Sequence, residues 1–438
     1  MSDPCSYSKE DYNQSIEYLY NLQVFGSKLG LTNIKKLCSM YNSPEKKLSF
    51  IHVAGTNGKG SVCAMLESIY RQAGYKTGLF TSPHLIYFGE RIQINGIPIK
   101  QETIISLIKR IKPVLAQFPK ESHPTFFEVI TLMGFLYFAE QQCDIVILET
   151  GLGGRLDSTN IITPQVSLIT NIDLEHQQYL GNTLSLIAKE KAGIIKHKVP
   201  IITAETKPEP LAVIRQIASE KEAPFYESNY QDNSFIPAID TLSSLTKVPY
   251  QRQNIGLVLK TVTVLQKKFP VDKTSISKGL SLVKWPGRFQ IFTLGHQTFI
   301  IDGAHNLSGF KALTNSLKTR FSQKPFTIIG VLADKNWSDI CSQLIPYSSG
   351  FITIPVQSPR TLPAETLANE LKKQAPAKMN ISAEKTLPKA LSKTKQEPLI
   401  LICGSLYLIG ESLKYLQENL LSPHPLEQKL NDWKMISS

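Results

Sequence analysis

The chain has 438 residues, of which 42% are hydrophobic and 19% charged, and its 48 basic and 36 acidic residues give a formal net charge of +12. A chain of this length exceeds one ordinary hydrophobic core, so two domains are expected. No apolar run reaches the roughly 18 residues that a membrane helix needs, which argues against a membrane protein.

The N-terminus and the cysteines indicate the compartment. The first residues, MSDPCSYSKEDYNQ, are polar and lack the apolar core of a secretory signal. The six cysteines lie far apart, without the clusters that metal sites or disulfide frameworks need. We therefore expect a cytoplasmic protein with reduced thiols.

The positive charge suits nucleic acid, anionic lipid or small polyanionic substrates. The lysines and arginines are spread through amphipathic patterns, with no dense basic block and no interleaved aromatic platform. This distribution argues against nucleic acid as a partner. It leaves small anionic substrates, or simply a solvated basic surface.

Short apolar runs alternate with helical patterns along most of the chain. Strands are expected at residues 48–54, 76–80, 143–149, 165–170 and 199–203, followed by helices at 209–222 and 254–269. Trp285, Pro286 and Gly287 interrupt any regular element, and a second alternation then has strands at 297–302, 325–332, 350–356 and 398–404. This order predicts βαβ units, mainly parallel sheets and a domain boundary near residues 284–290. Ligands of such sheets bind beyond the carboxyl ends of the strands.

The stretch HVAGTNGKGSV, residues 52–62, has the context of a phosphate-binding loop but not the usual spacing. Val53 stands where the P-loop pattern has its first glycine, and the hydroxyl after Lys59 comes one residue late, at Ser61. A strand precedes the loop and an amphipathic helix follows it, so backbone N–H groups, a helix N-terminus and Lys59 can converge on phosphate. The alternative is a glycine-rich turn with no ligand.

Two residues at strand ends are candidates for magnesium, which prefers oxygen ligands. Glu149 ends an apolar strand, and Ser82 follows another in the segment FTSPH. Each could instead be a strand-end cap. His176 follows a third strand, and the alternative there is an ordinary histidine.

Lys191 lies on the apolar face of a predicted helix. Leu184, Ile187, Ala188 and Ile195 recur on that face at helical spacing, whereas Lys189 points away. Spacing alone favours snorkelling, in which the stem packs and the ammonium reaches water. The other interpretation is a buried, neutral amine that reacts with carbon dioxide to give a carbamate.

In the second half, Arg288 follows the interruption and the segment IIDGAHN places Asp302, His305 and Asn306 at a strand end. An acidic residue suits ribose hydroxyls and an arginine suits phosphate, so this domain could close over a nucleotide. A structural salt bridge is the competing interpretation.

Taken in order, the motifs resemble those of the folylpolyglutamate synthase and dihydrofolate synthase family, within the Mur-type ATP-dependent amide ligases. They run over nearly the whole chain: LGLTNIKKL, IHVAGTNGKGSV, TSPHL, TFFEVITL, ETGLGGRLDSTN, EHQQYLG, EKAGI, WPGRFQ, DGAHN, GVLADKN and CGSLYLIGE. The resemblance implies an α/β fold. Residues 1–286 would form a P-loop-type, mainly parallel sheet domain that binds ATP and folate, and residues 287–438 a smaller Rossmann-like domain that closes over ATP and binds glutamate.

The resemblance also assigns roles to individual residues. Catalytic roles fall on Lys59, His176 and Lys191, with a carbamate on Lys191, and magnesium ligands on Ser82, Glu149 and His176. ATP contacts fall on Thr56, Asn57, Gly58, Lys59, Gly60, Ser61, Asn254, Arg288, Asp302 and His305. Folate contacts fall on Ser27, Lys28, Thr125, Phe126, Phe127, Glu128, Arg155, Leu156 and Asp157.

Two positions depart from the family pattern. The chain has Glu175-His176 where the family commonly has Asp-His, which only lengthens the side chain beside the histidine. It also has Tyr250-Gln251 where the family commonly has His-Gln, which replaces an imidazole expected near the adenine.

The implied reaction is ATP-dependent addition of L-glutamate to dihydropteroate, to the glutamate tail of reduced folates, or to both, through an acyl phosphate. We expect both reactions, because the motifs resemble bacterial bifunctional members. The substrates would be dihydropteroate or a reduced folate, L-glutamate and ATP with Mg²⁺, and the enzyme would act as a monomer. The rivals are a peptidoglycan-precursor ligase of the same superfamily and, less well supported, a P-loop NTPase, which would need the standard loop spacing that this chain lacks.

Overall fold

The computed structural model describes residues 7–26, 30–230 and 248–419, and the chain divides into two units. Unit 1 comprises Met1–Leu242 and Gln253–Val283, and unit 2 comprises Ser243–Arg252 and Lys284–Ser438. Helix α10 (Pro249–Leu265) spans the boundary between these segments. Each unit is described separately below.

Unit 1 is built on an eight-stranded sheet with the order β4-β3-β2-β5-β1-β6-β7-β8. Six neighbouring strands, β2, β5, β1, β6, β7 and β8, run parallel to one another. Strand β3 pairs antiparallel with β2, and β4 pairs antiparallel with β3 at the edge of the sheet. The strands are β1 (Phe50–Ala54), β2 (Thr77–Phe80), β3 (Ile92–Ile94), β4 (Ile97–Pro98), β5 (Ile145–Glu149), β6 (Val166–Ile169), β7 (Ile201–Thr203) and β8 (Phe225–Glu227).

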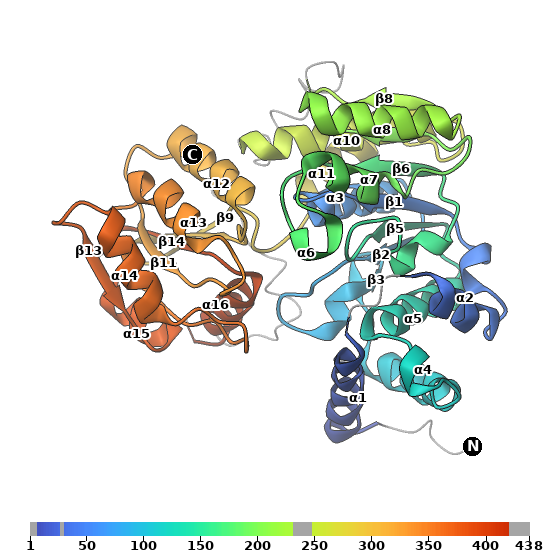
Figure 1. Ribbon diagram of the computed structural model, residues 1–438, viewed down its shortest axis with the longest axis horizontal. Coiled ribbons are helices and arrows are strands. Elements are labelled where there is room, and N and C mark those ends of the chain that lie inside the picture. Colours follow the sequence, from blue (N-terminus) through green and yellow to red (C-terminus); the bar gives the residue numbers. More distant parts are fainter. Residues whose placement is uncertain (1–6, 27–29, 231–247, 420–438) are drawn as a thin grey trace. The chain divides into compact units, whose positions relative to one another are not determined.

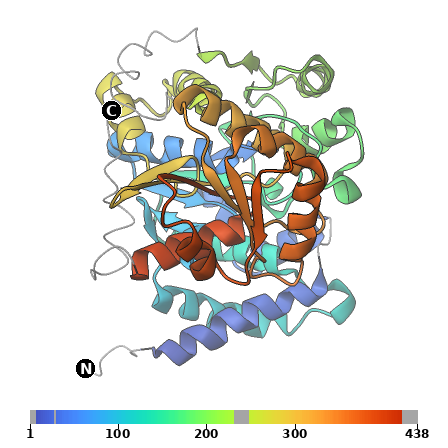
Figure 2. The same cartoon turned by 90° about the vertical axis from the view of Figure 1, so that its left-hand side faces the viewer.

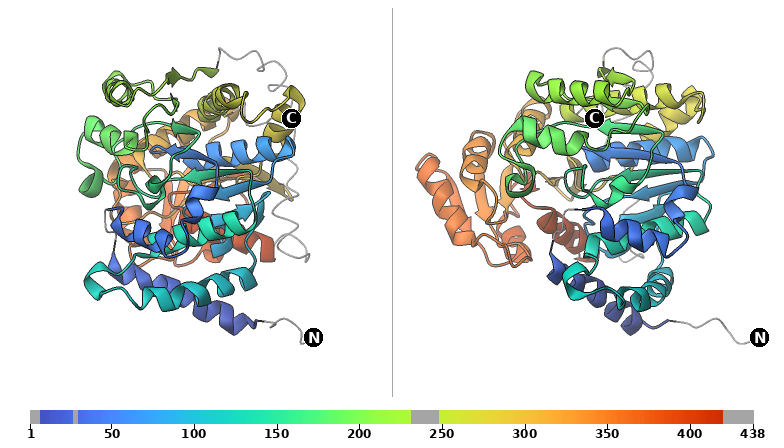
Figure 3. Two further views of the ribbon diagram at one scale, coloured as in Figure 1. Left: turned by 90° about the vertical axis from the view of Figure 1, so that its right-hand side faces the viewer. Right: turned by 45° about the vertical axis from the view of Figure 1, so that its right-hand side comes forward.

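Helices cover both faces of this sheet. They are α1 (Lys9–Asn21), α2 (Thr32–Ser39), α3 (Lys59–Gln72), α4 (Gln101–Leu115), α5 (Phe126–Glu140), α6 (Gln177–Leu180), α7 (Leu184–Ala192), α8 (Pro208–Glu220) and α11 (Lys273–Leu282). Because side chains alternate along a strand, Phe50 and Ala54 share one face, where Phe50 packs with α2, α4 and α5 and Ala54 packs with α7 and α8. Figure 3 shows α1 lying beside α4 in unit 1.

Helices α3 and α11 lie side by side in unit 1 (Figure 1). The hydroxyl of Ser68 donates to the carbonyl of Gly279 at 2.7 Å, and a Cβ on Gly279 would meet the Cα of Ile69 at 2.6 Å. The close approach of the two helices therefore depends on a residue without a side chain. It fixes α3, whose first residue is Lys59.

Unit 2 is built on a six-stranded sheet with the order β13-β12-β11-β14-β10-β9, parallel except for β9 beside β10. Figure 2 shows these strands with helices on both sides. The strands are β9 (Gln290–Leu294), β10 (Gln297–Asp302), β11 (Phe326–Ile329), β12 (Gly350–Thr353), β13 (Asn380–Ala383) and β14 (Leu399–Cys403), and the helices are α12 (Leu307–Arg320), α13 (Trp337–Leu344), α14 (Ala364–Gln374), α15 (Leu387–Lys393) and α16 (Leu406–Asn419).

The architecture confirms the expected α/β fold with mainly parallel sheets. All the expected strands form, each within its expected range, and the missed strands β3, β4, β8, β9 and β13 are short or lie toward the sheet edges. The five described cysteines are buried and unpaired. Within the described ranges, no helix is long and apolar enough to cross a membrane.

Candidate active site

The loop between β1 and α3 requires glycine at two positions. Gly55 and Gly58 have φ of 144° and 87°, in the region that residues with side chains rarely adopt. A Cβ on Gly55 would lie 1.8 Å from Oγ1 of Thr170, and one on Gly58 would lie 2.6 Å from Oδ1 of Asn254. Asn254, predicted to contact nucleotide, therefore lies against the loop.

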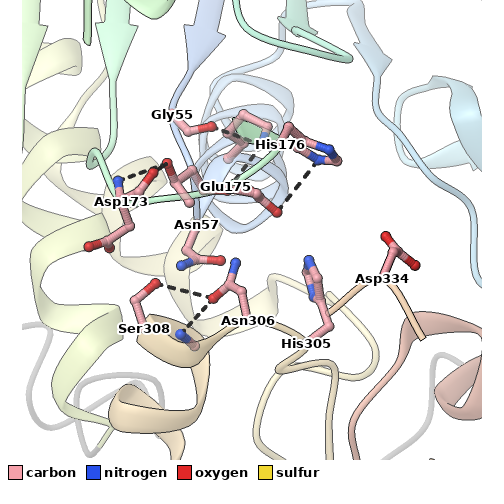
Figure 4. Close-up of polar contacts among 12 residues, drawn as sticks. Gly55, Asn57, Asp173, Glu175, His176, His305, Asn306, Ser308 and Asp334 are labelled. Carbon is pink, nitrogen blue, oxygen red and sulfur yellow. Dashed lines mark hydrogen bonds and ion pairs between the residues drawn. The ribbon is translucent and has the colours of Figure 1, made fainter. Parts of the chain in front are cut away.

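The segment that follows β6 anchors this loop. The amide of Asn57 donates to Oδ1 of Asn171 at 2.9 Å, and the hydroxyl of Thr170 donates to the carbonyl of Asn57 at 2.6 Å. The amide of Asp173 donates to Oγ1 of Thr56 at 3.0 Å (Figure 4). The sequence did not single out Asn171, because its role depends on β6 lying beside β1.

Two lysines of unit 1 converge on one carbonyl of the loop. Nζ of Lys59 donates to the carbonyls of Gly55 at 3.0 Å and Thr56 at 3.2 Å. Nζ of Lys191 donates to the same Gly55 carbonyl at 2.7 Å. Two amines predicted to act on substrate thus meet at the start of the phosphate loop.

Lys191 is buried, with 3% of its surface exposed. Snorkelling, the interpretation that spacing favoured, is therefore wrong, because α7 is covered where Lys191 lies. Burial, and next the neighbouring charge of Lys59, lower the pKa of Lys191 from 10.5 to about 7, against the opposing effects of Glu175 and Asp157. About half of the amine is then neutral near pH 7, the form that a carbamate requires, and the carbamate itself stays a prediction.

Ser82 and Glu149 lie together because β2 and β5 are parallel neighbours that end at the same edge of the sheet. The backbone amide of Ser82 donates to Oε2 of Glu149 at 3.1 Å, and Glu149 is buried. Among the described residues, no group of three or more histidines, cysteines, aspartates or glutamates could hold a metal ion. One carboxylate beside one hydroxyl suits Mg²⁺, which takes few protein ligands and completes its shell with phosphate and water.

His176 lies at the start of α6 with a φ of 49°. Its Nε2 is 3.7 Å from Oε1 of the buried Glu175 (Figure 4). About 40% of the His176 side chain is exposed. Its service as a third metal ligand beside Ser82 and Glu149 stays a prediction.

Asp157 braces the glycine-rich loop that follows β5. Its carboxylate accepts hydrogen bonds from the amides of Gly151 at 2.9 Å, Leu152 at 2.8 Å and Thr159 at 3.0 Å. Oγ1 of Thr159 donates to the same carboxylate and also contacts Nε2 of the buried His52 at 2.8 Å. Burial raises the pKa of Asp157 although these donors oppose the shift. The structure gives this predicted folate contact a role in shaping its own loop.

The same loop is fastened to α7, the helix that carries Lys191. The amide of Arg155 donates to the carbonyl of Glu190 at 2.7 Å, and its guanidinium donates to the Glu190 carboxylate at 2.9 Å. A Cβ on Gly154 would lie 2.7 Å from the carbonyl of Lys191. Leu156, the next predicted folate contact, is half-buried.

The segment TFFE, also predicted to contact folate, begins helix α5. Thr125 and Glu128 form a capping box, in which the amide of Thr125 donates to Oε2 of Glu128 at 2.8 Å and the amide of Glu128 donates to Oγ1 of Thr125 at 3.3 Å. Phe126 stacks on Tyr20 at 5.7 Å between ring centroids. Phe127 lies against the glycine-rich loop, since a Cβ on Gly151 would meet its ring at 2.4 Å.

In unit 2, three of the predicted nucleotide contacts lie around the end of β10. The Asp302 carboxylate accepts from the amides of Phe289 and Ala304, both at 2.8 Å. Arg288 lies against the same segment, since a Cβ on Gly303 would meet its Nη1 at 2.0 Å, and Nδ1 of His305 is 2.8 Å from the Gly303 carbonyl.

Asn306 has a structural role at the start of α12. Its Oδ1 accepts from the amide of Gly309 at 2.8 Å and from the hydroxyl of Ser308 at 3.1 Å (Figure 4). This N-cap satisfies an amide in the first turn of α12. The remaining predicted contacts, Ser27 and Lys28, lie outside the described residues.

Family models match both halves of the chain: the Mur ligase middle domain over residues 53–234 and the Mur ligase glutamate ligase domain over residues 287–406. The chain is 36% identical over 430 residues to the dihydrofolate synthase/folylpolyglutamate synthase of Bacillus subtilis, covering 93% of this chain and 99% of that protein. The chain belongs to the dihydrofolate synthase/folylpolyglutamate synthase family. The resemblance carried by the sequence motifs is thereby confirmed.

Solved structures of this family share the fold. The folylpolyglutamate synthase of Thermotoga maritima is 32% identical with a TM-score of 0.80, over 95% of this chain and 99% of that one. The bifunctional folylpolyglutamate synthase/dihydrofolate synthase of Yersinia pestis, complexed with AMPPNP and a Mn ion, is 26% identical with a TM-score of 0.80, over 94% and 100% of the two chains. A nucleotide analogue and a divalent ion thus occupy a relative of the same architecture.

Proposed function

We propose that the chain is an ATP-dependent ligase that adds L-glutamate to dihydropteroate and to the glutamate tail of reduced folates. The main support is the arrangement at one edge of the unit 1 sheet. There the glycine loop contacts Lys59 and Lys191, and Ser82 and Glu149 lie at the ends of neighbouring strands. The chain that carries this arrangement belongs to the dihydrofolate synthase/folylpolyglutamate synthase family. A peptidoglycan-precursor ligase and a P-loop NTPase switch are less favoured by the family membership.

The loop supplies the phosphate site. Helix α3 begins at Lys59, directly after Gly58, so the partial positive charge of its N-terminus would face the triphosphate. Thr56 and Asn57 shape the turn, while Gly60 and Ser61 lie in the first turn of the helix. Lys59, held now by two carbonyls, is close enough to exchange them for phosphate oxygens.

Ser82 and Glu149, with His176 as the further predicted ligand, would hold the Mg²⁺ that accompanies ATP. When bound, the ion neutralises negative charge on the phosphates. Glu149 is buried at the end of β5, and its carboxylate accepts a hydrogen bond from the Ser82 amide.

ATP is required because a carboxylate and an amine do not condense in water. The substrate carboxylate attacks the γ-phosphorus, the bond to the bridging oxygen breaks, and ADP leaves while an acyl phosphate forms. The amine of glutamate then attacks the acyl carbon and expels phosphate, which gives the amide and releases a proton. Lys59 would offset the charge on the transferring group, and Lys191 would act beside it as an amine or as its carbamate.

The 151–157 loop and the start of α5 would bind the pteridine-bearing substrate, with Phe127 against the ring. Unit 1 would hold ATP and the folate, and residues 287–438 would bind glutamate and contribute Arg288, Asp302 and His305 to the nucleotide. Both acceptors are proposed because the relatives from Bacillus subtilis and Yersinia pestis carry both activities in their names.

The test offers the purified protein ATP, Mg²⁺, labelled glutamate and either dihydropteroate or tetrahydrofolate, and measures ADP and labelled product. We expect one ADP for each glutamate added with both acceptors. Absence of ADP with dihydropteroate would refute the dual assignment, and absence with both would refute the function.

Two controls make the result specific. A muramyl-nucleotide precursor with amino acids should give no ADP, and turnover with it would instead support the peptidoglycan ligase. Lys59→Met should abolish ADP formation, whereas Lys189→Met, on the exposed side of α7, should leave it unchanged.

A further inference from the structure

Tyr250 contacts a carboxylate that the proposed nucleotide site uses. It lies in the first turn of α10, in the part of that helix that belongs to unit 2. Its hydroxyl donates to Oδ2 of Asp302 at 3.2 Å. The sequence alone predicted only that a tyrosine here removes an imidazole, so this hydrogen bond gives the residue a partner that spacing did not reveal.

The Asp302 carboxylate is buried and all of its contacts here are donors. Oδ1 accepts from the amide of Ala304, and Oδ2 accepts from the amide of Phe289 and from Tyr250. The two amides are fixed by the course of the chain, whereas the tyrosine is a side chain that can be changed without moving the backbone. Tyr250 is therefore the adjustable member of the set.

Asp302 in turn holds the turn that carries Arg288. Gly287 and Phe289 on either side of it have φ of 71° and 49°, a conformation that costs energy for phenylalanine. Two hydrogen bonds keep this turn in place. The Phe289 amide donates to the Asp302 carboxylate, and the Gly303 amide donates to the Gly287 carbonyl at 2.8 Å. A change in the orientation of the Asp302 carboxylate would therefore alter this turn and move Arg288.

We propose that Tyr250 is a positioning residue for nucleotide binding, whose hydroxyl fixes the orientation of the Asp302 carboxylate and, through the Phe289 amide, the placement of Arg288. This inference rests on the proposed function, in which Asp302 and Arg288 contact ATP. In this role Tyr250 acts through Asp302.

The charges around Asp302 set the direction of a pH effect. The charged and titratable groups that face it are Arg288 from the turn, Tyr250 from α10 and Cys403 from β14. Burial, and next the charge of Asp302, raise the pKa of the Cys403 thiol. Burial raises the pKa of Asp302, and Arg288, the two amides and the tyrosine hydroxyl oppose this. Loss of the hydroxyl removes a donor to the ionised form, so the carboxylate should protonate at a higher pH.

The experiment compares Tyr250→Phe with wild type in the glutamate-ligase assay. We expect the KM for ATP to rise about ten-fold, the size expected for one hydrogen bond to a charged group, with the KM for glutamate and for dihydropteroate unchanged. The acid limb of the kcat/KM profile for ATP should move to higher pH by up to about one unit. Tyr347→Phe, in the same core of unit 2, is the matched control and should behave as wild type.

A double-mutant cycle separates positioning from a general loss of structure. If Tyr250 acts through Asp302, then Tyr250→Phe should have no further effect on ATP affinity in an Asp302→Asn background. Additive effects, an unchanged acid limb, or an equal loss for all three substrates would overturn the proposal. If wild type shows no ligase turnover, the proposed function fails, and calorimetric binding of ADP to the same four proteins still decides the role of Tyr250.

Discussion

Replacing Lys191 by methionine should make the protein more stable and inactive at once. Lys191 is buried on α7 and donates to the Gly55 carbonyl, and its pKa is lowered to about 7. Methionine has a similar length and no charge. The substitution therefore removes the cost of the buried ammonium and, with it, the amine that the proposed mechanism places at the phosphate loop.

The shift in pKa gives the size of the effect. The pKa of Lys191 falls from 10.5 in the unfolded chain to about 7 in the folded protein, and each pKa unit corresponds to about 1.36 kcal/mol. Keeping Lys191 charged therefore costs the folded protein on the order of 5 kcal/mol. Between these two pH values the unfolded chain keeps a proton that the folded protein has released, so wild type gains stability as the pH rises through this window. The cost is complete below pH 7, and the advantage of Lys191→Met should shrink by about 3 kcal/mol between pH 6 and pH 9.

Urea denaturation of both proteins at pH 6, 7, 8 and 9 measures this difference, in buffers free of carbon dioxide so that no carbamate forms. Lys189→Met on the exposed side of the same helix is the control and should give a difference that is constant with pH. A constant difference for Lys191→Met as well, or a variant less stable than wild type at pH 6, would refute the reasoning. In the separate ligase assay, added bicarbonate should not restore the activity of Lys191→Met.

Three further predictions follow from the site. Gly55→Ala should abolish nucleotide binding and lower the melting temperature, because its Cβ would lie 1.8 Å from the Thr170 hydroxyl oxygen; a variant that binds a fluorescent ATP analogue as wild type does would contradict this. Glu149→Gln should raise the Mg²⁺ concentration for half-maximal ligase rate at least about ten-fold, whereas Glu140→Gln, at an exposed ion pair, should not; an unchanged requirement would count against Glu149 as a ligand. Thr125→Ala should lower the free energy of unfolding in urea by about 1 kcal/mol through loss of the α5 capping box, and an unchanged value would show that the cap contributes nothing.

The fold could be predicted where hydrophobic patterns were long and local. The parallel strands β1, β5 and β14 are buried along their whole length and are mostly apolar, as expected of strands covered on both faces. Strands β3 and β4 span only Ile92–Ile94 and Ile97–Pro98, too short for alternation to register. Strand β3 forms by pairing with β2, and β4 by pairing with β3, and no local sequence pattern reports either pairing.

The site divides in the same way. The glycine loop and its lysine form one contiguous motif, and their environment could be derived from the sequence. The face of α7 that carries Lys191 followed from helical spacing, but its degree of burial did not, because that depends on Gly154 and the loop packed over it.

The segment TFFE has a structural role beside its predicted contact with substrate. The spacing of Thr125 and Glu128 is also the signature of a capping box, which the structure shows at the start of α5, and the substrate contact stays a prediction. Asn171 was missed for a physical reason, since its side-chain oxygen reaches the Asn57 amide of the loop only after β6 has paired with β1.

The two hydrogen bonds from the Lys59 ammonium to the Gly55 and Thr56 carbonyls affect how a measured ligand affinity is interpreted. Any triphosphate that engages this ammonium must first displace it from Gly55 and Thr56, so the binding constant reports an exchange of partners and not a new attraction alone. A weak apparent contribution of Lys59 to ground-state affinity would therefore be compatible with a large contribution to rate, where charge on the transferred group is greatest.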